Sequence, residues 1–369
     1  MPLTFVLFGS TGDLAQKKIM PALALMHRRG AFPQGSEIIA YSRRAWTDTE
    51  YRDFIRPALT HLDKNIVEAF LQTVRYSRGT FDDPASYAAL KGNIHTSNVF
   101  FHLAVQPEFF ASIVEGLGHA GLQGSLLIEK PFGRDKISAE TLQMHIEKYF
   151  APEQVFRVDH YLGKAGLDVV SKEKLLPENT SAISARIFSP SLLEGRGEFF
   201  DTIGEMRDVG QNHLLQMLAA TLGERREEVL ENLSPDLSTV VRGQFEGYRD
   251  IPGVAPDSQT ETYFKLTAHS SDPRWTGVPL YLEAGKGLAQ KKSEIVVIFK
   301  DGAQRTFDMD AGNGVDYVTV LEAALRGEKD RFVSLEEVYA SWRFVDLVIE
   351  HFASTPLTLY PQGSDTLSV

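Results

Sequence analysis

The 369-residue sequence contains no cysteine. Disulfides, thiolate zinc sites and cysteine nucleophiles are therefore excluded. Basic side chains are also in the minority, with 38 Lys and Arg against 49 Asp and Glu and a formal net charge of −11. Nucleic acids and anionic membranes both select a net basic face, so we expect neither as the principal partner. An anionic small molecule would need a local cluster of Lys, Arg and His.

Long hydrophobic runs are missing as well. No stretch of about 18 apolar residues occurs, so we expect no transmembrane helix. The opening MPLTFVLFGSTGDLA lacks the basic segment and the long apolar stretch of a secretory signal, which favours a cytoplasmic enzyme. A chain of this length exceeds one ordinary core and predicts two domains.

The two halves of the sequence follow different patterns. In the first half, β-forming runs alternate with helical stretches, which predicts parallel βαβ units; these runs lie at 3–9, 37–43, 99–105 and 125–130. Past about residue 175, strands follow one another with only two helical tracts between them, which predicts a mainly antiparallel sheet covered by helices; the runs lie at 182–188, 261–269, 279–285 and 294–300, and the tracts around 206–221 and 334–353. We therefore expect a Rossmann-like α/β domain over 1–157 and an α+β domain over 158–369.

The first predicted strand leads into a glycine turn, FGSTGDLA, with Gly9 and Gly12 before a helix. Glycines let the backbone turn sharply and approach a pyrophosphate, which the amide groups at a helix N-terminus attract. The alternative is a plain turn that starts a helix. The second strand ends in Arg43 and Arg44, where NAD-specific folds usually carry a carboxylate; guanidinium groups suit the 2′-phosphate of NADP. A solvated basic pair is the alternative there.

Two further segments indicate a site for hydride transfer. Lys130 ends the run at 125–130, and the carboxyl ends of parallel strands open onto the ligand crevice of this fold class. His213 follows Asp208 at the head of an apolar helical stretch. Imidazole suits a base that removes a hydroxyl proton, and a carboxylate on its other nitrogen would orient it. A surface lysine and a packed core histidine are the alternatives.

Two clusters could face an anion. The segment RVDHYLGK places Asp159, His160, Tyr161 and Lys164 within six positions. It predicts either a solvated loop or an anionic substrate held beside an acid/base pair. The segment YLEAGKGLAQKKSE supplies three lysines, Lys286, Lys291 and Lys292, in a glycine-containing turn between strands, with a solvated hairpin as the alternative.

Taken together, these segments resemble the glucose-6-phosphate dehydrogenase family nearly from end to end. GSTGDLA, AYSRR, IEKPFGRD, RVDHYLGK, EGRGEFFDTIGEMRDVGQNHLLQML, RWTGVPLYLEAGKGLAQKKSEI and WRFVDLVIEHF appear in the family's order. DHYLGK and EKPFGRD are the most specific. The resemblance implies a Rossmann-like NADP-binding domain over 1–157 and a substrate-binding and oligomerisation domain over 158–369. NAD stays open as the cofactor, and a homodimer stays open as the assembly.

The resemblance also implies a role for each candidate residue. The cofactor's phosphate turn would be lined by Gly9, Thr11, Gly12, Asp13 and Leu14, with Arg43 at the 2′-phosphate and Arg44 beside it. Lys130 would lie between cofactor and sugar, and its bond to Pro131 would be cis. The substrate phosphate would be held by His160, Tyr161 and Lys164, and the sugar by Asp208 and Lys286, with Lys291 standing where an arginine is common. Asp159 would orient His213, the base that takes the C1 hydroxyl proton while hydride leaves for the nicotinamide and a lactone forms.

The sequence departs from the family at several positions. Ser189 stands where the family has a sugar-binding glutamate, Ala165 where a glutamate follows the phosphate-binding lysine, and Gln16 where a lysine lies beside the phosphate turn. The segment KDGAQRTFDMDAGNGV is much shorter than its counterpart, which removes part of the large sheet, a substrate contact and a second NADP site. A site that loses a polar contact can change its substrate.

Three hypotheses follow from these observations. The first is an NADP-dependent dehydrogenase that oxidises C1 of glucose 6-phosphate. The second is a dehydrogenase for an amino, deoxy or epimeric hexose phosphate, which Ser189 and the shortened segment motivate. The third is a regulatory protein that binds NADP without turnover, against which the presence of Asp159 and His213 argues.

Overall fold

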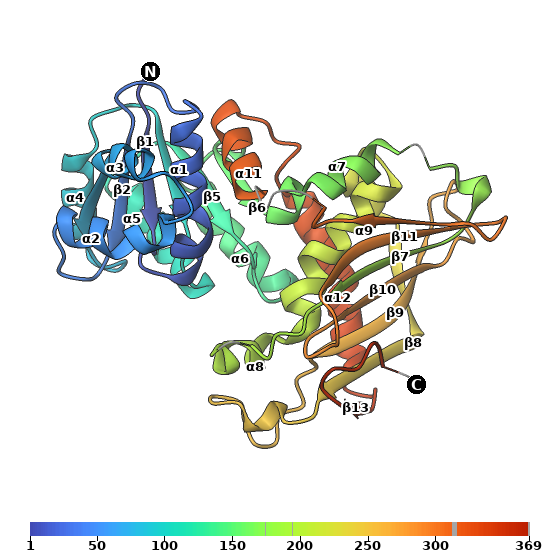
Figure 1. Ribbon diagram of the computed structural model, residues 1–369. Coiled ribbons are helices and arrows are strands. Elements are labelled where there is room, and N and C mark those ends of the chain that lie inside the picture. Colours follow the sequence, from blue (N-terminus) through green and yellow to red (C-terminus); the bar gives the residue numbers. More distant parts are fainter. Residues whose placement is uncertain (174, 194, 312–315, 368–369) are drawn as a thin grey trace. The chain divides into compact units, whose positions relative to one another are not determined.

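The computed structural model describes residues 1–173, 175–193, 195–311 and 316–367. The chain divides into two compact units (Figure 1). The first unit comprises Met1–Gly133, Ile137–Gly163 and Val315–Val333, and the second comprises Arg134–Lys136, Lys164–Gly314 and Ser334–Val369. Each unit has its own sheet. Among the described residues, no helix has both the length and the apolar character that crossing a membrane requires.

The first unit is built on a six-stranded sheet in which every pairing is parallel. The strands are β1 (Thr4–Phe8), β2 (Glu37–Ser42), β3 (Val74–Arg78), β4 (Val99–Leu103), β5 (Ser125–Glu129) and β6 (Val155–Val158). Their order, β3-β2-β1-β4-β5-β6, is the order of the Rossmann fold. The predicted α/β class is confirmed. β3 and β6 escaped the sequence analysis.

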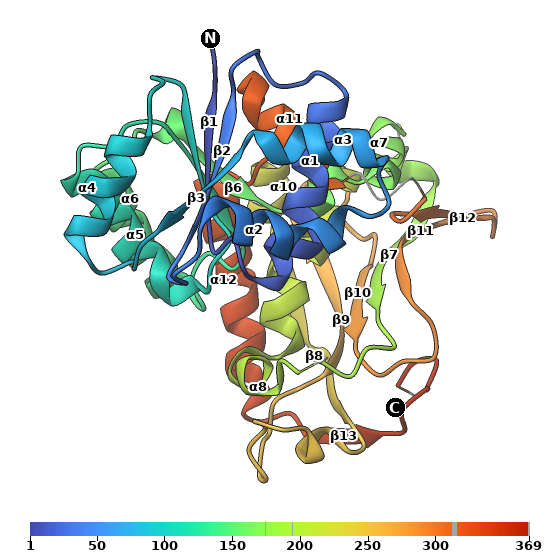
Figure 2. The same ribbon diagram turned by 60° about the vertical axis from the view of Figure 1, so that its left-hand side comes forward.

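Helices cover both faces of this sheet. They are η1 (Ala15–Ile19), α1 (Met20–Arg28), α2 (Asp48–Ile55), η2 (Arg56–Leu59), α3 (Lys64–Gln72), α4 (Pro84–Asn93), η3 (Pro107–Phe109), α5 (Phe110–His119), α6 (Lys136–Glu147), η4 (Pro152–Gln154), η5 (His160–Gly163) and α11 (Asp316–Arg326). Figure 2 shows α1, α2 and α3 on one side of the strands and α4 and α5 on the other. Such two-sided cover explains why the strands read as continuous apolar runs.

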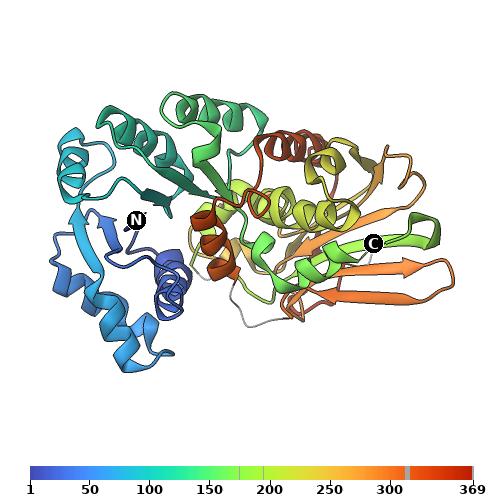
Figure 3. The ribbon, with the colours of Figure 1, turned by 90° about the horizontal axis from the view of Figure 1, so that it is seen from above.

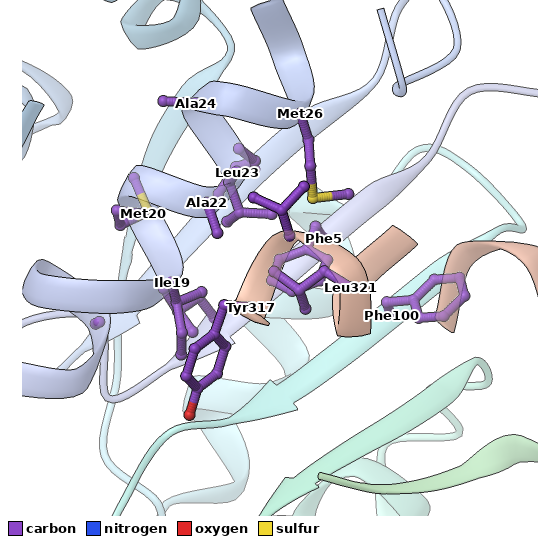
Figure 4. Close-up of a cluster of buried hydrophobic side chains, with 14 of the residues drawn as sticks. Phe5, Ile19, Met20, Ala22, Leu23, Ala24, Met26, Phe100, Tyr317 and Leu321 are labelled. Atoms are coloured by element: carbon purple, nitrogen blue, oxygen red, sulfur yellow. The ribbon is translucent and has the colours of Figure 1, made fainter. Parts of the chain in front are cut away.

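α1 shows how sequence spacing builds this core. Its buried residues Met20, Leu23 and Met26 recur at helical spacing and pack toward Phe5 of β1. Figure 4 shows these side chains beside Tyr317 and Leu321 of α11, a helix from late in the chain. Each large apolar side chain that is fully buried contributes about 1.5–3 kcal/mol. α11 therefore belongs to the core of the first unit.

The second unit is built on a seven-stranded mixed sheet. The strands are β7 (Thr180–Phe188), β8 (Leu233–Phe245), β9 (Tyr263–Ser270), β10 (Leu280–Gly285), β11 (Lys292–Phe299), β12 (Gln304–Asp308) and β13 (Leu357–Tyr360), in the order β12-β11-β7-β10-β9-β8-β13. Most neighbours are antiparallel, as predicted, whereas β7 with β10 and β8 with β13 are parallel.

Helices and short helical turns make up much of the rest of the second unit. They are α7 (Ala165–Lys172), η6 (Pro177–Asn179), α8 (Gly197–Glu205), η7 (Met206–Leu214), α9 (Leu215–Leu222), α10 (Arg226–Glu231), η8 (Tyr248–Asp250) and α12 (Leu335–Phe352). η7 contacts β7 and β10, and α12 contacts β8. Figure 3 shows the yellow-green helices and the red α12 along the same side of the orange strands.

The helical tract predicted around 206–221 begins as a π-helix, η7, and continues as α9. Gly204, with φ 72°, breaks the helical backbone one residue before the end of α8, just ahead of η7. π-Helical turns are rare in proteins, and those that occur often lie at functional sites. This one carries both Asp208 and His213, and it buries both.

Candidate active site

The glycine turn follows β1, which forms the central pair of strands in its sheet together with β4. Gly9 has φ +75°, and a Cβ added to it would lie 2.2 Å from the carbonyl oxygen of Ala104. The amide of Gly12 donates to the carbonyl of Gly9 over 2.9 Å, and the side-chain amide of Gln16 donates to the carbonyl of Thr11 over 3.1 Å. Only glycine fits at position 9. The turn is closed by its own hydrogen bonds.

The other predicted residues of this turn face in different directions. The hydroxyl of Thr11 lies 3.2 Å from that of Ser42, at the end of β2. Asp13 is exposed and pairs with Lys17 over 2.8 Å. Leu14 packs against the hydrophobic core. The side chain of Leu14 therefore stabilises the helix start, and only its backbone is available to an anion.

Arg43 and Arg44 follow the end of β2, and both are exposed. The guanidinium of Arg44 lies 4.8 Å from the ring centroid of Trp46, a cation–π contact. The hydroxyl of Tyr76 donates to the carbonyl of Arg44 over 2.8 Å, which holds the loop. β1 and β2 are adjacent and in register up to Phe8 and Tyr41. The glycine turn and the two arginines therefore lie at the same edge of the sheet.

Lys130 directly follows β5 and is half-buried. The Lys130–Pro131 bond is cis, as the resemblance implied. The residue before it, Glu129, was quoted in the motif but given no role. Its carboxylate lies 2.9 Å from His102 Nε2 and accepts a 3.1 Å hydrogen bond from the hydroxyl of Tyr317. Burial and the neighbouring Glu129 carboxylate raise the pKa of Tyr317 well above its ordinary value.

The DHY segment lies where β6 ends. Asp159 is fully buried, and its carboxylate accepts the amide of Tyr161 over 3.0 Å. Its carbonyl accepts the amide of Leu162 over 3.0 Å, which begins η5. The ring of His160 stacks on that of Tyr317 with a centroid distance of 5.7 Å and an interplanar angle of 11°. Both His160 and Glu129 are thus held by a tyrosine from α11.

Lys164 belongs to the second unit, where it stands directly before the first residue of α7. Its ammonium forms a salt bridge with Asp310, just past β12, and the ammonium of Lys291 lies 2.7 Å from the other oxygen of the same carboxylate. Burial opposes ionisation of Asp310, but the hydrogen bonds from both lysines outweigh it and lower its pKa. The structure therefore brings together two predicted lysines through an acid that the sequence analysis missed.

Lys286 is buried at the end of β10 between two carboxylates. Its ammonium lies 3.0 Å from Glu205 and 3.2 Å from Asp208. Burial pulls the pKa of Lys286 down, but these two charges outweigh it, so the pKa is raised. The structure thus brings together Lys286 and Asp208, both of which were predicted to contact the sugar. Glu205 was missed, although its spacing of three from Asp208 places both on one side of a helix.

His213 is buried on η7, one turn beyond Asp208, and its amide donates to the side chain of Asn212 over 2.8 Å. Asp159 lies in the first unit and His213 in the second, so their pairing stays a prediction. The hydroxyl of Ser189 is used within its own loop, where it accepts a hydrogen bond from the amide of Ser191 over 3.1 Å. Its own amide donates to the carbonyl of Gly285, next to Lys286, over 2.9 Å.

Comparisons with known proteins place this geometry in a family. Residues 6–168 match the model described as glucose-6-phosphate dehydrogenase, NAD binding domain, which indicates a nicotinamide dinucleotide cofactor, and residues 181–315 match that of the C-terminal domain. The chain is 31% identical to a glucose-6-phosphate 1-dehydrogenase of Helicobacter pylori, over 98% of this chain and 96% of that protein. It is 30% identical to one of Mycolicibacterium smegmatis, over 99% and 94%.

Two solved structures are also similar. A glucose-6-phosphate 1-dehydrogenase from Mycobacterium avium superposes with a TM-score of 0.88 at 28% identity, covering 100% of this chain and 95% of that one. A glucose-6-phosphate dehydrogenase in complex with its substrate glucose-6-phosphate gives 0.90 at 26% identity, covering 99% and 95%. The chain belongs to the glucose-6-phosphate dehydrogenase family of oxidoreductases.

Proposed function

We propose that this protein transfers a hydride from C1 of glucose 6-phosphate to NADP and forms the lactone. The observation that carries the proposal is the buried arrangement on η7. There Asp208 is held by Lys286, and His213 follows on the same helix. The similarity to a solved dehydrogenase in complex with glucose-6-phosphate supports this choice of substrate. The first unit would bind the cofactor, and the second would supply the sugar contacts.

The residues at the end of β1 and β2 fit the cofactor. Gly9 must be a glycine, Gly12 is exposed, and the turn starts a helix, as a pyrophosphate site requires. Arg43 would pair with the 2′-phosphate, and Arg44, stacked on Trp46, would form the floor beside it. NADP supplies the hydride acceptor when it is bound. Lys130, after β5, would lie between cofactor and sugar.

The phosphate of the substrate would be held by His160, Tyr161, Lys164 and Lys291. Lys164 and Lys291 bring two ammonium groups to one point, and the half-buried imidazole of His160 is oriented by its stacking on Tyr317. A local basic cluster of this kind is what an acidic protein needs to bind an anion. The sugar hydroxyls would contact Asp208 and Lys286.

The chemical step needs a base near neutrality. His213 would take the proton of the C1 hydroxyl while the hydrogen on C1 leaves with its electron pair for the nicotinamide, so that C1 becomes the lactone carbonyl. The carboxylate of Asp159 would stabilise the imidazolium that results. The carboxylate of Asp159 is already fixed by the amide of Tyr161.

Ser189 favours a second candidate, a modified hexose phosphate. Its hydroxyl is used within its own loop, so the site lacks the carboxylate that the resemblance leads one to expect there. A site that hydrogen-bonds fewer ring hydroxyls discriminates less strongly between sugars.

A spectrophotometric screen tests both candidates. NADPH and NADH formation would be followed with glucose 6-phosphate, glucosamine 6-phosphate, galactose 6-phosphate and the free hexoses. We expect the highest kcat/KM with glucose 6-phosphate and NADP. If glucose 6-phosphate turns over no better than the other two hexose phosphates, the second candidate replaces the first. NADP binding without turnover of any sugar phosphate contradicts both.

A further inference from the structure

The carboxylate of Asp310 already occupies the two lysines that would hold the substrate phosphate. One of its oxygens pairs with Lys164 and the other lies 2.7 Å from Lys291. The side chain of Lys164 is 11% exposed, whereas that of Lys291 is 71% exposed. The pair with Lys164 is therefore the better shielded from solvent and counter-ions.

The backbone holds this carboxylate in place. The side chain of Asp308, the last residue of β12, accepts the amide of Asp310 over 2.8 Å. Met309 between them is buried. A Cβ added to Gly166, near the start of α7, would lie 2.1 Å from the carbonyl oxygen of Asp308, so α7 and the end of β12 approach closely. Asp310 is thereby brought to Lys164 across 146 positions of sequence.

The charges of this cluster have a direct consequence for an incoming anion. Two ammonium groups share one carboxylate, so one of the two positive charges is compensated before any ligand binds. An arriving phosphate dianion must either displace the carboxylate or share the lysines with it at the cost of like-charge repulsion. Both routes weaken phosphate binding.

We propose that Asp310 is a specificity-determining residue that competes with the substrate's phosphate for Lys164 and Lys291. It sets how strongly the enzyme prefers a phosphorylated sugar over a neutral one. This inference rests on the proposed function, because it takes Lys164 as part of the phosphate site. It adds that the site carries its own anion, supplied by the short segment after β12.

The test compares Asp310→Asn with wild type. The Kd for inorganic phosphate, measured by calorimetry, and the KM for glucose 6-phosphate should each fall by about 3- to 10-fold, because the competing negative charge is removed. A tenfold fall in Kd corresponds to about 1.4 kcal/mol of binding free energy. The kcat should stay unchanged, and so should the kcat/KM for free glucose. Asp310→Glu keeps the negative charge, so it should bind phosphate about as weakly as wild type does. Asp301→Asn, on the exposed hairpin between β11 and β12, removes the same charge and should change none of these values.

A rise in KM and Kd in Asp310→Asn would overturn the inference, because it would mean that Asp310 positions the lysines for phosphate. Asp310→Ser provides the same comparison if the asparagine variant does not fold. Lys164→Ala separates this inference from the proposed function. If Lys164→Ala leaves phosphate binding intact, the proposed phosphate site is wrong. If it weakens binding but Asp310→Asn does not strengthen it, only the role of Asp310 is wrong.

Discussion

His213 is the residue on which the proposed chemistry most depends. His213→Ala should lower kcat by a factor on the order of 10² to 10⁴, because the C1 hydroxyl loses its base, and should leave KM for glucose 6-phosphate nearly unchanged. Steady-state kinetics at saturating NADP checks this. His61→Ala, at an exposed histidine of the first unit, is the matched control. A large rise in KM with unchanged kcat would contradict the assignment.

Arg43 should decide between the two nicotinamide cofactors. Arg43→Ala removes a guanidinium from the proposed 2′-phosphate site, so the preference for NADP over NAD, measured as the ratio of kcat/KM values, should fall about tenfold or more. Arg44→Ala is the matched variant, since Arg44 is also exposed but stacks on Trp46. An unaltered ratio in Arg43→Ala together with a reduced one in Arg44→Ala would transfer the role to Arg44.

Glu205 should matter for stability, because it is one of two carboxylates that compensate the buried Lys286. Glu205→Gln leaves Asp208 as the only counter-charge of Lys286 among the ion pairs of the described residues. The free energy of unfolding in urea should fall by about 1–3 kcal/mol. Glu228→Gln breaks an ion pair with Arg225 whose side chains are 51% and 66% exposed, and should cost less than about 1 kcal/mol. Equal effects of the two variants would contradict the buried-pair argument.

At the level of elements, the buried acid Glu261 contacts the junction of α8 and η7. Glu261 accepts the amide of Met206 over 3.0 Å, and a Cβ added to Gly204 would lie 2.4 Å from its carboxylate. Burial raises the pKa of Glu261 from 4.5 to about 7. This difference corresponds to at most about 3 kcal/mol of unfolding free energy.

The sign of this pH dependence follows from the raised pKa. The folded state keeps the proton of Glu261 up to a pH of about 7, whereas the unfolded state releases it above 4.5. The stabilisation is complete below 4.5 and is lost as the pH rises through about 7. Unfolding measured between about pH 5 and pH 8 should show wild type losing about 2–3 kcal/mol relative to Glu261→Gln. Parallel pH profiles of the two proteins would contradict this.

Elements with strong apolar runs were predictable, and those that depend on distant pairing were not. β1, β2, β4 and β5 are buried on both faces and read as continuous apolar runs. β3 carries Arg75 and Arg78 at the edge of the sheet, and β8 contains Pro235, so neither shows a strand pattern. The parallel pairing of β7 with β10 is a long-range choice that no local pattern encodes.

The site shows the same division. Residues inside recognisable motifs, such as Gly9, Lys130 and Lys286, could be proposed from the sequence, and their roles in the site stay predictions. The contact of Asp310 with Lys164 could not be predicted, because the two residues are 146 positions apart and the segment of Asp310 belongs to no motif. The π-helical form of η7 was equally hidden, since its apolar spacing is that of an ordinary helix.

For the whole molecule, the proposed division of labour predicts separate responses to the two ligands. A ligand that binds only the folded state slows hydrogen exchange where it binds. NADP alone should slow exchange of the glycine turn at 9–16, in the first unit, and glucose 6-phosphate alone should slow that of η7 and of the turn at 286–292, in the second. Exchange followed by mass spectrometry, with each ligand added singly, measures this.

Lys164→Ala sharpens the same experiment. It should lose the protection by glucose 6-phosphate while keeping the protection by NADP, because Lys164 belongs to the second unit and the glycine turn to the first. Protection of the glycine turn by glucose 6-phosphate alone would contradict the proposal, because it would show that the sugar binds to the first unit. Sedimentation of the same samples would test the homodimer, which stays a prediction. A chain of net charge −11 needs a local cluster of basic side chains to bind either anionic ligand. The two predicted patterns of slowed exchange would locate these clusters.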